Sequence, residues 1–384
     1  MPSFQKIDES DIEVGVPLQR PVYDSHGTLL IKVGGVIGSA QQLSILLDKE
    51  IFFVVDQDNS PGPTSAADSD VGETDVFAIL DEAKAKLTRI FDLLRQGRAH
   101  DDFVSRIKGI ATSVQKACAL DADAALANLQ LELDASYPVV HHLQAAILCE
   151  LTGKKLGVKD ESRRKLVKAA RTRDIDLMDI QQVLDKQTIP LSDKHLERIQ
   201  KHPASSTARL RELGVSDKSW LDAVEHHHER LDGSGYPGRL AGNAIGIPAR
   251  LLAITDIYSA MIRDRANRKA ILPKEALRKL LLEHKGKIDD RLTQVLIKEI
   301  GIYPPGVIVE LANKEIAVVK SRGDDGLHPH VYAFIDSAGM PLRKPYACET
   351  TAPEFQVKGL LPTADFRASI PALRNLWVET EEEP

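Results

Sequence analysis

The sequence predicts a mainly α-helical protein with a small β unit at the N-terminus and a short β segment at the C-terminus. Apolar residues recur every three to four positions from about residue 76 to about residue 300, which is the spacing of amphipathic helices. Short runs of β-branched and aromatic residues, separated by Gly and Pro, stand before and after that stretch. With 384 residues, the chain is long enough for two or three domains.

Residues 1–56 are predicted to form the N-terminal β unit. The stretch 21–24 leads through a Ser-His-Gly turn signal into the apolar stretch 28–31, and a further apolar stretch at 51–55 closes the unit. Residues 57–75 are rich in Asp, Ser, Gly, Pro and Thr. Because this composition cannot bury an apolar face, we expect a flexible linker there.

Residues 76–300 are predicted to form the helical domain. The apolar positions that begin it are Phe77, Leu80, Ala83, Leu87, Ile90 and Leu94. Helical patterns continue to residue 151, resume over 160–175 and run past residue 257. Residues 301–384 turn to short β patterns at 306–311, 316–319 and 331–335, and end in an acidic tail that we expect to be frayed.

Composition and charge exclude several classes of function. The net charge of −6 and the pI of about 6.1 argue against binding DNA or RNA, which usually needs a basic face. The three cysteines are distant and form no CxxC motif, so we expect no disulfide framework and a reducing compartment. No apolar run reaches the roughly 18–20 residues of a membrane helix, and the first residues lack a signal-peptide pattern. These observations predict a cytoplasmic protein without a membrane anchor.

Histidines are concentrated in the middle of the chain. Seven of the 12 lie between His141 and His228, in a helical region rich in Asp. Imidazole and carboxylate are common metal ligands, so this region is a candidate metal site. Two adjacent histidines on a helix point about 100° apart, and both reach one metal only near a helix end. Residues 232–235, Asp-Gly-Ser-Gly, supply such a break. The alternative is a solvated polyhistidine helix end followed by a turn.

The string at 227–237, His-His-Glu-x-x-Asp-Gly-Ser-Gly-Tyr-Pro, resembles the second signature of HD-GYP domains. Gly235, Tyr236 and Pro237 are the GYP itself. The similarity continues through 249–258 and 273–277, and it includes the His-Pro pair that begins at His202. It spans roughly residues 76–300. The resemblance implies a helical HD-type bundle that holds two or three metal ions, often iron, and opens cyclic di-GMP.

The resemblance also implies the ligands. The second metal site would use Asp174, His202, His227 and His228, with Asp174 and His202 acting in catalysis. The first would use His141, Asp174, Asp256 and the histidine of the His-Asp pair. Iron or manganese is the expected metal. The Gly235–Pro237 loop would contact substrate or partner proteins, including diguanylate cyclase (GGDEF) domains. Arg250 and Arg268 could meet a phosphate, or form salt bridges instead.

Four positions depart from the family pattern. Arg173 stands where the family has the histidine of the His-Asp pair, and Leu177 replaces a lysine. Tyr137 stands where the family has an acidic residue, and Ser259 replaces an Asp. A guanidinium stays protonated and cannot bind a metal. If Arg173 points inward, we expect loss of the first metal and pairing with Asp256. If it points outward, three ligands remain, and His142 could complete a weak site.

Three functions follow as hypotheses. The chain could be a cyclic di-GMP phosphodiesterase with an impaired site, weakly active or inactive, since losing one electrostatic donor such as the lysine typically costs about 10²–10³ in rate. It could be a non-catalytic module that binds cyclic di-GMP or a partner through the GYP loop. It could also be a structural adaptor that makes its contacts through the β units. The sequence favours one retained metal site and a weak or absent activity, and it leaves a homodimer open.

Overall fold

The computed structural model describes most of the helical and C-terminal chain and short stretches of the N-terminal part. The described residues are 3–7, 11–12, 18, 22–24, 29–31, 47, 51–55, 75–98, 102–133, 136–178, 192–264, 268–323 and 325–378. They divide into two compact units, Met1–Ser69 and Asp70–Pro384. The predicted linker at 57–75, apart from its last residue, and the acidic tail at 379–384 lie outside the described residues.

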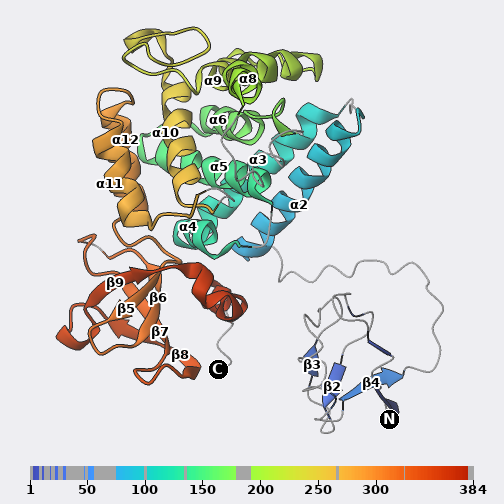
Figure 1. Ribbon diagram of the computed structural model, residues 1–384, viewed down its shortest axis with the longest axis vertical. Coiled ribbons are helices and arrows are strands. Elements are labelled where there is room, and N and C mark those ends of the chain that lie inside the picture. Colours follow the sequence, from blue (N-terminus) through green and yellow to red (C-terminus); the bar gives the residue numbers. More distant parts are fainter. Residues whose placement is uncertain are drawn as a thin grey trace. The chain divides into compact units, whose positions relative to one another are not determined.

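The N-terminal unit contains a four-stranded antiparallel sheet (Figure 1). Its order is β1 (Ser3–Lys6), β4 (Ile51–Val55), β2 (Val22–Asp24) and β3 (Leu29–Ile31). β2 and β3 pair with each other, as the turn signal between them predicts. The apolar pattern identified β2, β3 and β4, but β1 was not predicted. Val22 and Ile51 are fully buried and form part of a small core of their own.

The second unit is mainly helical, which confirms the predicted fold class. Its longer helices, in chain order, are α2 (Val76–Arg95), α3 (Phe103–Leu120), α4 (Ala122–Leu131), α5 (Tyr137–Lys155), α6 (Asp160–Thr172), α8 (Asp193–Glu212), α9 (Lys218–His226), α10 (Ile247–Met261), α11 (Pro273–Glu283) and α12 (Asp290–Ile300). Among the described residues, no helix is both long and apolar enough to cross a bilayer.

Helix α5 is the centre of this bundle (Figure 1). It contacts α2, α3, α4, α6, α10 and α12, and its residues from Pro138 to Gly153 are all buried. A helix enclosed on every side usually carries only apolar residues. The two histidines near its start, His141 and His142, are therefore polar groups placed in the middle of the core, where each needs a hydrogen-bonding or charged partner.

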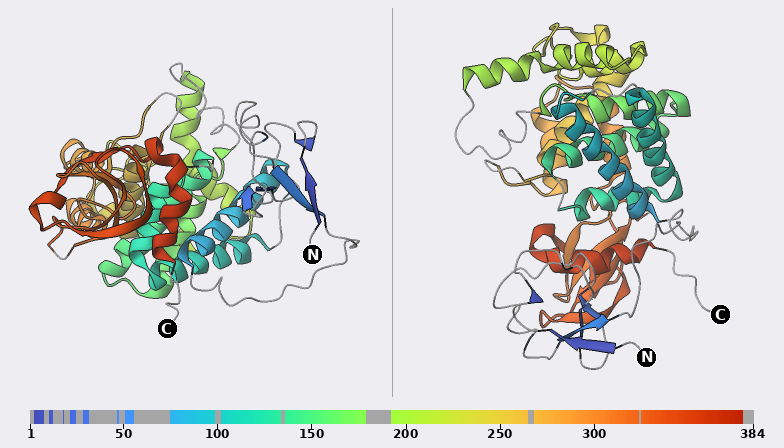
Figure 2. Two further views of the ribbon diagram at one scale, coloured as in Figure 1. Left: turned by 90° about the horizontal axis from the view of Figure 1, so that it is seen from below. Right: turned by 90° about the vertical axis from the view of Figure 1, so that its right-hand side faces the viewer.

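The C-terminal segment forms a five-stranded antiparallel sheet at one end of the helical body (Figures 1 and 2). The order is β8 (Pro341–Glu349), β7 (His330–Ile335), β6 (Ile316–Ser321), β5 (Ile308–Leu311) and β9 (Val357–Leu361). Ile308 and Val318 join the helical core, whereas Val309 and Ala317 face a second cluster within the sheet. The alternation of strand side chains thus attaches one face of the sheet to the helices.

Two contacts strengthen this attachment. Gly306 approaches α4 so closely that a Cβ atom there would lie 2.7 Å from the carbonyl oxygen of Ala127, and its φ of +83° also favours glycine. At the end of the chain, Arg374 forms a 2.7 Å ion pair with Asp81 of α2. The sheet and the helices therefore form one unit.

Arg171, in the last turn of α6, is an unusual feature of the core. It is fully buried, and its three guanidinium nitrogens have no hydrogen-bond partner within the described chain. Burial alone lowers the pKa of this group to about 9. An unpaired buried charge is costly because the lost hydration is not replaced.

We predict that Arg171→Met stabilises the protein by roughly 1–3 kcal/mol, because it removes a buried polar group that has no partner and keeps a flexible, unbranched apolar side chain in the core. Urea unfolding at pH 7.5 measures this effect. Arg89→Met, at an exposed position of α2, is the matched control and should leave the free energy of unfolding within about 0.5 kcal/mol. A destabilised Arg171→Met variant would contradict the prediction.

Candidate metal centre

Residues from five parts of the chain meet beside the start of α5. The six expected ligands lie within this cluster: His141 on α5, Asp174 just after α6, His202 on α8, His227 and His228 at the end of α9, and Asp256 on α10. The ligand atoms of His202, His227 and His228 lie within 4.8 Å of one another, and so do those of His141, Asp174 and Asp256. The fold therefore brings together the residues that the sequence singled out.

In one half of the cluster, nitrogen and oxygen lone pairs converge. Nε2 of His202 lies 3.1 Å from Oδ1 of Asp174 and 3.3 Å from Nε2 of His227, which is itself 3.7 Å from the same oxygen. Nδ1 of His202 donates to the carbonyl oxygen of Ile199 and Nδ1 of His227 to that of Val224, each at 2.6 Å. A carbonyl can only accept, so each ring carries a proton on Nδ1 and turns its Nε2 towards the carboxylate.

His228 completes this half. Its ring centroid lies 4.1 Å from that of His227 and 4.9 Å from that of His202. Burial lowers the pKa of His227 and holds that of His228 well below its usual value, which keeps both rings neutral. Three imidazoles and one carboxylate fit a divalent transition-metal ion. We call Asp174, His202, His227 and His228 the histidine half.

His142 also faces Asp174. Its Nδ1 donates to the carbonyl oxygen of Pro138 at 2.6 Å, and its Nε2 lies 3.5 Å from Oδ2 of Asp174 without a hydrogen bond. Burial, followed by the charge of Arg173, lowers the pKa of His142 to about 3. From the sequence, His142 was expected only as a substitute metal ligand. The adjacent His-His pair at 141–142 was the signal that both could face the site.

The other half of the cluster contains a guanidinium. Arg173 is fully buried and points inward, and its Nε lies 2.7 Å from Oδ1 of Asp256 and 3.4 Å from Oδ2 of Asp174. Its Nη1 donates to the carbonyl oxygen of Ala170 at 2.5 Å. Of the two orientations considered from the sequence, the structure has the inward one. We call Arg173, Asp256, His141 and Ser259 the arginine half.

His141 is held by hydrogen bonds in the arginine half. Its Nε2 lies 3.0 Å from Oδ1 of Asp256, and its Nδ1 lies 3.1 Å from the hydroxyl of Ser259. In a neutral ring Nε2–H donates to the carboxylate, which can only accept, while the single proton of the serine hydroxyl is shared between Nδ1 and the carbonyl oxygen of Thr255 at 2.8 Å. Burial and then Arg173 lower the pKa of His141, so the ring is neutral. With Nε2 protonated and a guanidinium beside Asp256, this half does not fit a metal ion.

Arg173, Asp256 and Asp174 stabilise one another's charged forms. Burial alone would raise the pKa of Asp174 and of Asp256, but the adjacent Arg173 guanidinium and the neighbouring histidines hold both values well below the usual range. Burial would lower the pKa of Arg173, and Asp256 and Asp174 raise it instead. All three groups therefore stay charged at neutral pH.

Glu229 organises the loop that carries the GYP residues. Its buried carboxylate accepts the backbone N–H groups of Gly238 at 2.6 Å and of Leu240 at 2.9 Å. A Cβ atom on Gly235 would lie 2.4 Å from Cα of Glu229, so only glycine fits. Tyr236 stands over His228 with the ring centroids 4.8 Å apart. Glu229 lies inside the signature, but its role was not predicted from the sequence.

The remaining singled-out residues lie around the cluster. Leu177 is buried, and Tyr137 stacks on His141 with centroids 5.1 Å apart. Arg250 donates to the carbonyl oxygen of Ile245 at 2.7 Å and forms an ion pair with Asp289 at 3.1 Å. Of the two roles considered for Arg250, a phosphate contact or a salt bridge, the structure has the salt bridge. Arg268 is exposed and donates to the carbonyl oxygen of Ala260. Pro237 at the loop tip is exposed.

Comparisons with known proteins agree with this geometry. A family model described as an HD domain matches residues 128–292. The cyclic di-GMP phosphodiesterase PA4108 of Pseudomonas aeruginosa is 27% identical, over 66% of this chain and 61% of its own length. The cyclic di-GMP phosphodiesterase PdeB of Borreliella burgdorferi is 28% identical, over 49% of each chain. The chain thus spans less than two thirds of these relatives.

Other relatives differ in the substrate that their names give. A 3'3'-cGAMP-specific phosphodiesterase 1 from Vibrio cholerae is 28% identical, over 42% of this chain and 38% of its own length. Among solved structures, the HDG"Y"P protein Bd1817 from Bdellovibrio bacteriovorus matches with a TM-score of 0.51 and 16% identity. That match covers 77% of this chain and 99% of the other, and it shows a shared fold.

We predict that Arg173→Met lowers the stability of the metal-free protein by about 3–5 kcal/mol at pH 7.5, because it leaves two buried carboxylates without their cation. In the wild type the depressed pKa values of Asp174 and Asp256 contribute stability above pH 3.9, the ordinary Asp value, and this contribution is lost as the pH falls through the folded values. In the variant burial raises these pKa values, so the destabilisation should shrink from pH 7.5 towards pH 4.5.

Urea unfolding in EDTA at the two pH values measures this difference. Arg106→Met is the control, since it breaks a 2.7 Å ion pair with Asp102 in which both side chains are more than a third exposed. It should cost less than about 1 kcal/mol at either pH. An Arg173→Met variant that is as stable as the wild type at pH 7.5 would contradict the assigned role of this residue.

Proposed function

We propose that the HD-GYP domain of this chain is a cyclic di-GMP signalling module whose phosphodiesterase activity is weak or absent, because Arg173 takes the place of the first metal. The chain carries an HD-GYP domain, as the HD-domain match and the similarity to cyclic di-GMP phosphodiesterases support. The observation that carries the proposal is the 2.7 Å contact between the Arg173 guanidinium and Asp256.

The histidine half would hold one divalent metal, with iron or manganese expected from the family resemblance. When bound, a metal there would supply a Lewis acid for a phosphoryl oxygen. His202 and His227 fix their Nε2 lone pairs through the bonds to backbone carbonyls, and Asp174 supplies the negative charge. These residues would position a phosphate, while Tyr236 covers one side of the histidines.

The arginine half would contribute charge but no metal ligand. Arg173 neutralises Asp256 and leaves Ser259 and His141 in closed hydrogen bonds. At position 177 a buried leucine offers no cation to a phosphate. Binding of the cyclic dinucleotide with slow or no hydrolysis is therefore the expected behaviour. Placement in the cytoplasm, where the three cysteines would stay reduced, belongs to this proposal.

A second candidate function is supported by the GYP loop. Pro237, Gly238 and Arg239 are exposed, while Glu229 fixes the backbone beneath them. A loop that is both rigid and exposed loses little entropy when a partner binds. A partner such as a diguanylate cyclase (GGDEF) domain is the alternative occupant, and the same surface could serve a homodimer.

We predict that Arg173→His combined with Leu177→Lys gains a second metal equivalent and at least about 10² in hydrolysis rate, since it removes the competing guanidinium and adds an electrostatic donor. Metal content by elemental mass spectrometry on protein purified without a His-tag, and product formation from cyclic di-GMP and 3'3'-cGAMP, measure the two effects. Arg89→His, which adds a histidine at an exposed position, is the control and should change neither.

For the wild type we expect one metal equivalent, cyclic di-GMP binding by calorimetry, and little product. Two equivalents in the wild type, or hydrolysis as fast as in the double variant, would overturn the proposal. If the wild type binds neither metal nor cyclic dinucleotide, the GYP loop becomes the preferred functional surface. Calorimetry with a purified diguanylate cyclase domain and the Arg239→Glu variant then tests that surface.

A further inference from the structure

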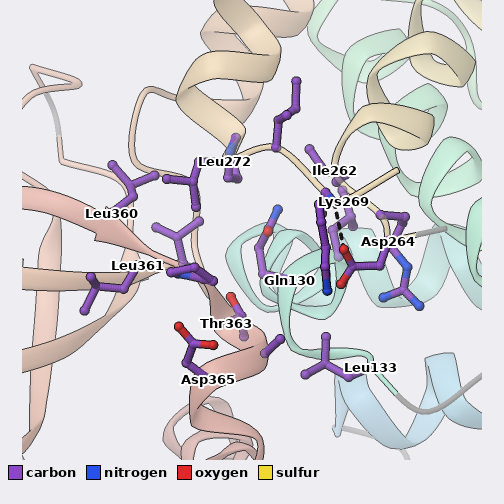
Figure 3. A pocket seen from close by; sticks show the side chains of 18 of the residues that line it. Gln130, Leu133, Ile262, Asp264, Lys269, Leu272, Leu360, Leu361, Thr363 and Asp365 are labelled. Atoms are coloured by element: carbon purple, nitrogen blue, oxygen red, sulfur yellow. Dashed lines mark hydrogen bonds between the residues drawn. The ribbon is translucent and has the colours of Figure 1, made fainter. Parts of the chain in front are cut away.

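A cavity of about 570 Å³ lies between the helical body and the C-terminal sheet (Figure 3). Leu360 and Leu361 form one wall, and Ile262, Asp264 and Lys269 lie opposite them, with Gln130 between. This volume is in the range of pockets that bind small molecules. None of the six residues expected as metal ligands lines it.

The side-chain amide of Gln130 is the first sign of a ligand. Gln130 is 8% exposed, and its amide makes no hydrogen bond within the described part of the chain. Its amide atoms are not sealed from solvent, so the cavity reaches them, and a ligand there can replace the water that solvates the donors and the acceptor. A planar group with a donor and an acceptor on one edge, such as a purine base, would satisfy both.

The walls of the cavity supply apolar surface and positive charge, which a nucleotide also requires. Leu129, Leu133, Leu360 and Leu361 offer apolar surface for a flat ring. At the rim, Lys269 is exposed and has no ion pair in the described residues. Three cations, Arg263, Lys269 and Arg367, line the cavity against two carboxylates. Asp264 already accepts the backbone N–H of Ala270 at 2.8 Å.

We propose that this cavity is a second binding site, separate from the metal cluster, for a purine nucleoside monophosphate. The base would lie between the leucines with its edge on Gln130, and the phosphate would meet Lys269 at the rim. Tyr137 lines the cavity and its ring stacks on His141, so one aromatic ring separates the nucleotide from the metal cluster. The site goes beyond the proposed function and does not require cyclic di-GMP to be bound or hydrolysed.

Calorimetric titration of the full-length, EDTA-treated protein with GMP and with AMP tests the proposal. We expect at least one of them to bind, with guanosine, adenosine and inorganic phosphate all weaker. Gln130→Leu should weaken binding at least tenfold, as expected for about 1.4 kcal/mol of lost hydrogen bonding. Lys269→Ala should weaken it severalfold, and Lys285→Ala, at an exposed position outside the cavity, should leave it unchanged.

A second substitution distinguishes a loss of nucleotide binding from a folding defect. Ala364→Trp adds bulk at an exposed position of the cavity wall and should abolish binding while the thermal unfolding midpoint stays within a few degrees of the wild type. The His227→Ala variant should bind the mononucleotide as the wild type does. Loss of binding in His227→Ala would place the nucleotide at the metal cluster and overturn the proposal. Failure of both nucleotides to bind, or unchanged binding by Gln130→Leu and Ala364→Trp, would overturn it as well.

Discussion

Two buried carboxylates, Asp174 and Asp256, need positive charge beside them, and this requirement governs the centre of the helical unit. Both lie where burial alone would raise their pKa, yet both are held ionised. The compensating charge comes from a residue of the chain itself, Arg173. Its Nε lies 2.7 Å from Oδ1 of Asp256 and 3.4 Å from Oδ2 of Asp174. A guanidinium has directed donors and cannot dissociate from the chain, so one of the two negative charges is already compensated before any metal binds.

The same interaction divides the cluster into two unlike halves. On the arginine side, His141 forms hydrogen bonds with both Asp256 and Ser259. On the histidine side, backbone carbonyls accept hydrogen bonds from Nδ1–H of His202 and of His227, which turns the Nε2 atoms of both rings towards Asp174. Asp174, in the histidine half, also contacts Arg173. A metal in the histidine half and the guanidinium would therefore share one carboxylate, which is compatible with binding a phosphate and unfavourable for a second metal.

Local patterns in the sequence identified much of this arrangement, and tertiary contacts decided the rest. The 3.6-residue period identified α2, and the GYP string together with His202 identified the histidine half. The direction of Arg173 could not be predicted, because its partner Asp256 lies 83 residues away on α10. The first strand and the last two were missed: β8 is largely exposed with Arg343 and Lys344 in its middle, so it lacks the alternation of a half-buried strand.

We propose that the Arg173 guanidinium occupies the place of a first metal ion. Anomalous diffraction above and below the manganese edge, on crystals of the wild-type protein grown with excess Mn²⁺, tests it most directly. We expect one anomalous peak, among Asp174, His202, His227 and His228, with the guanidinium still bonded to Asp256. A second peak among His141, Asp174 and Asp256, with Arg173 turned away, would contradict it.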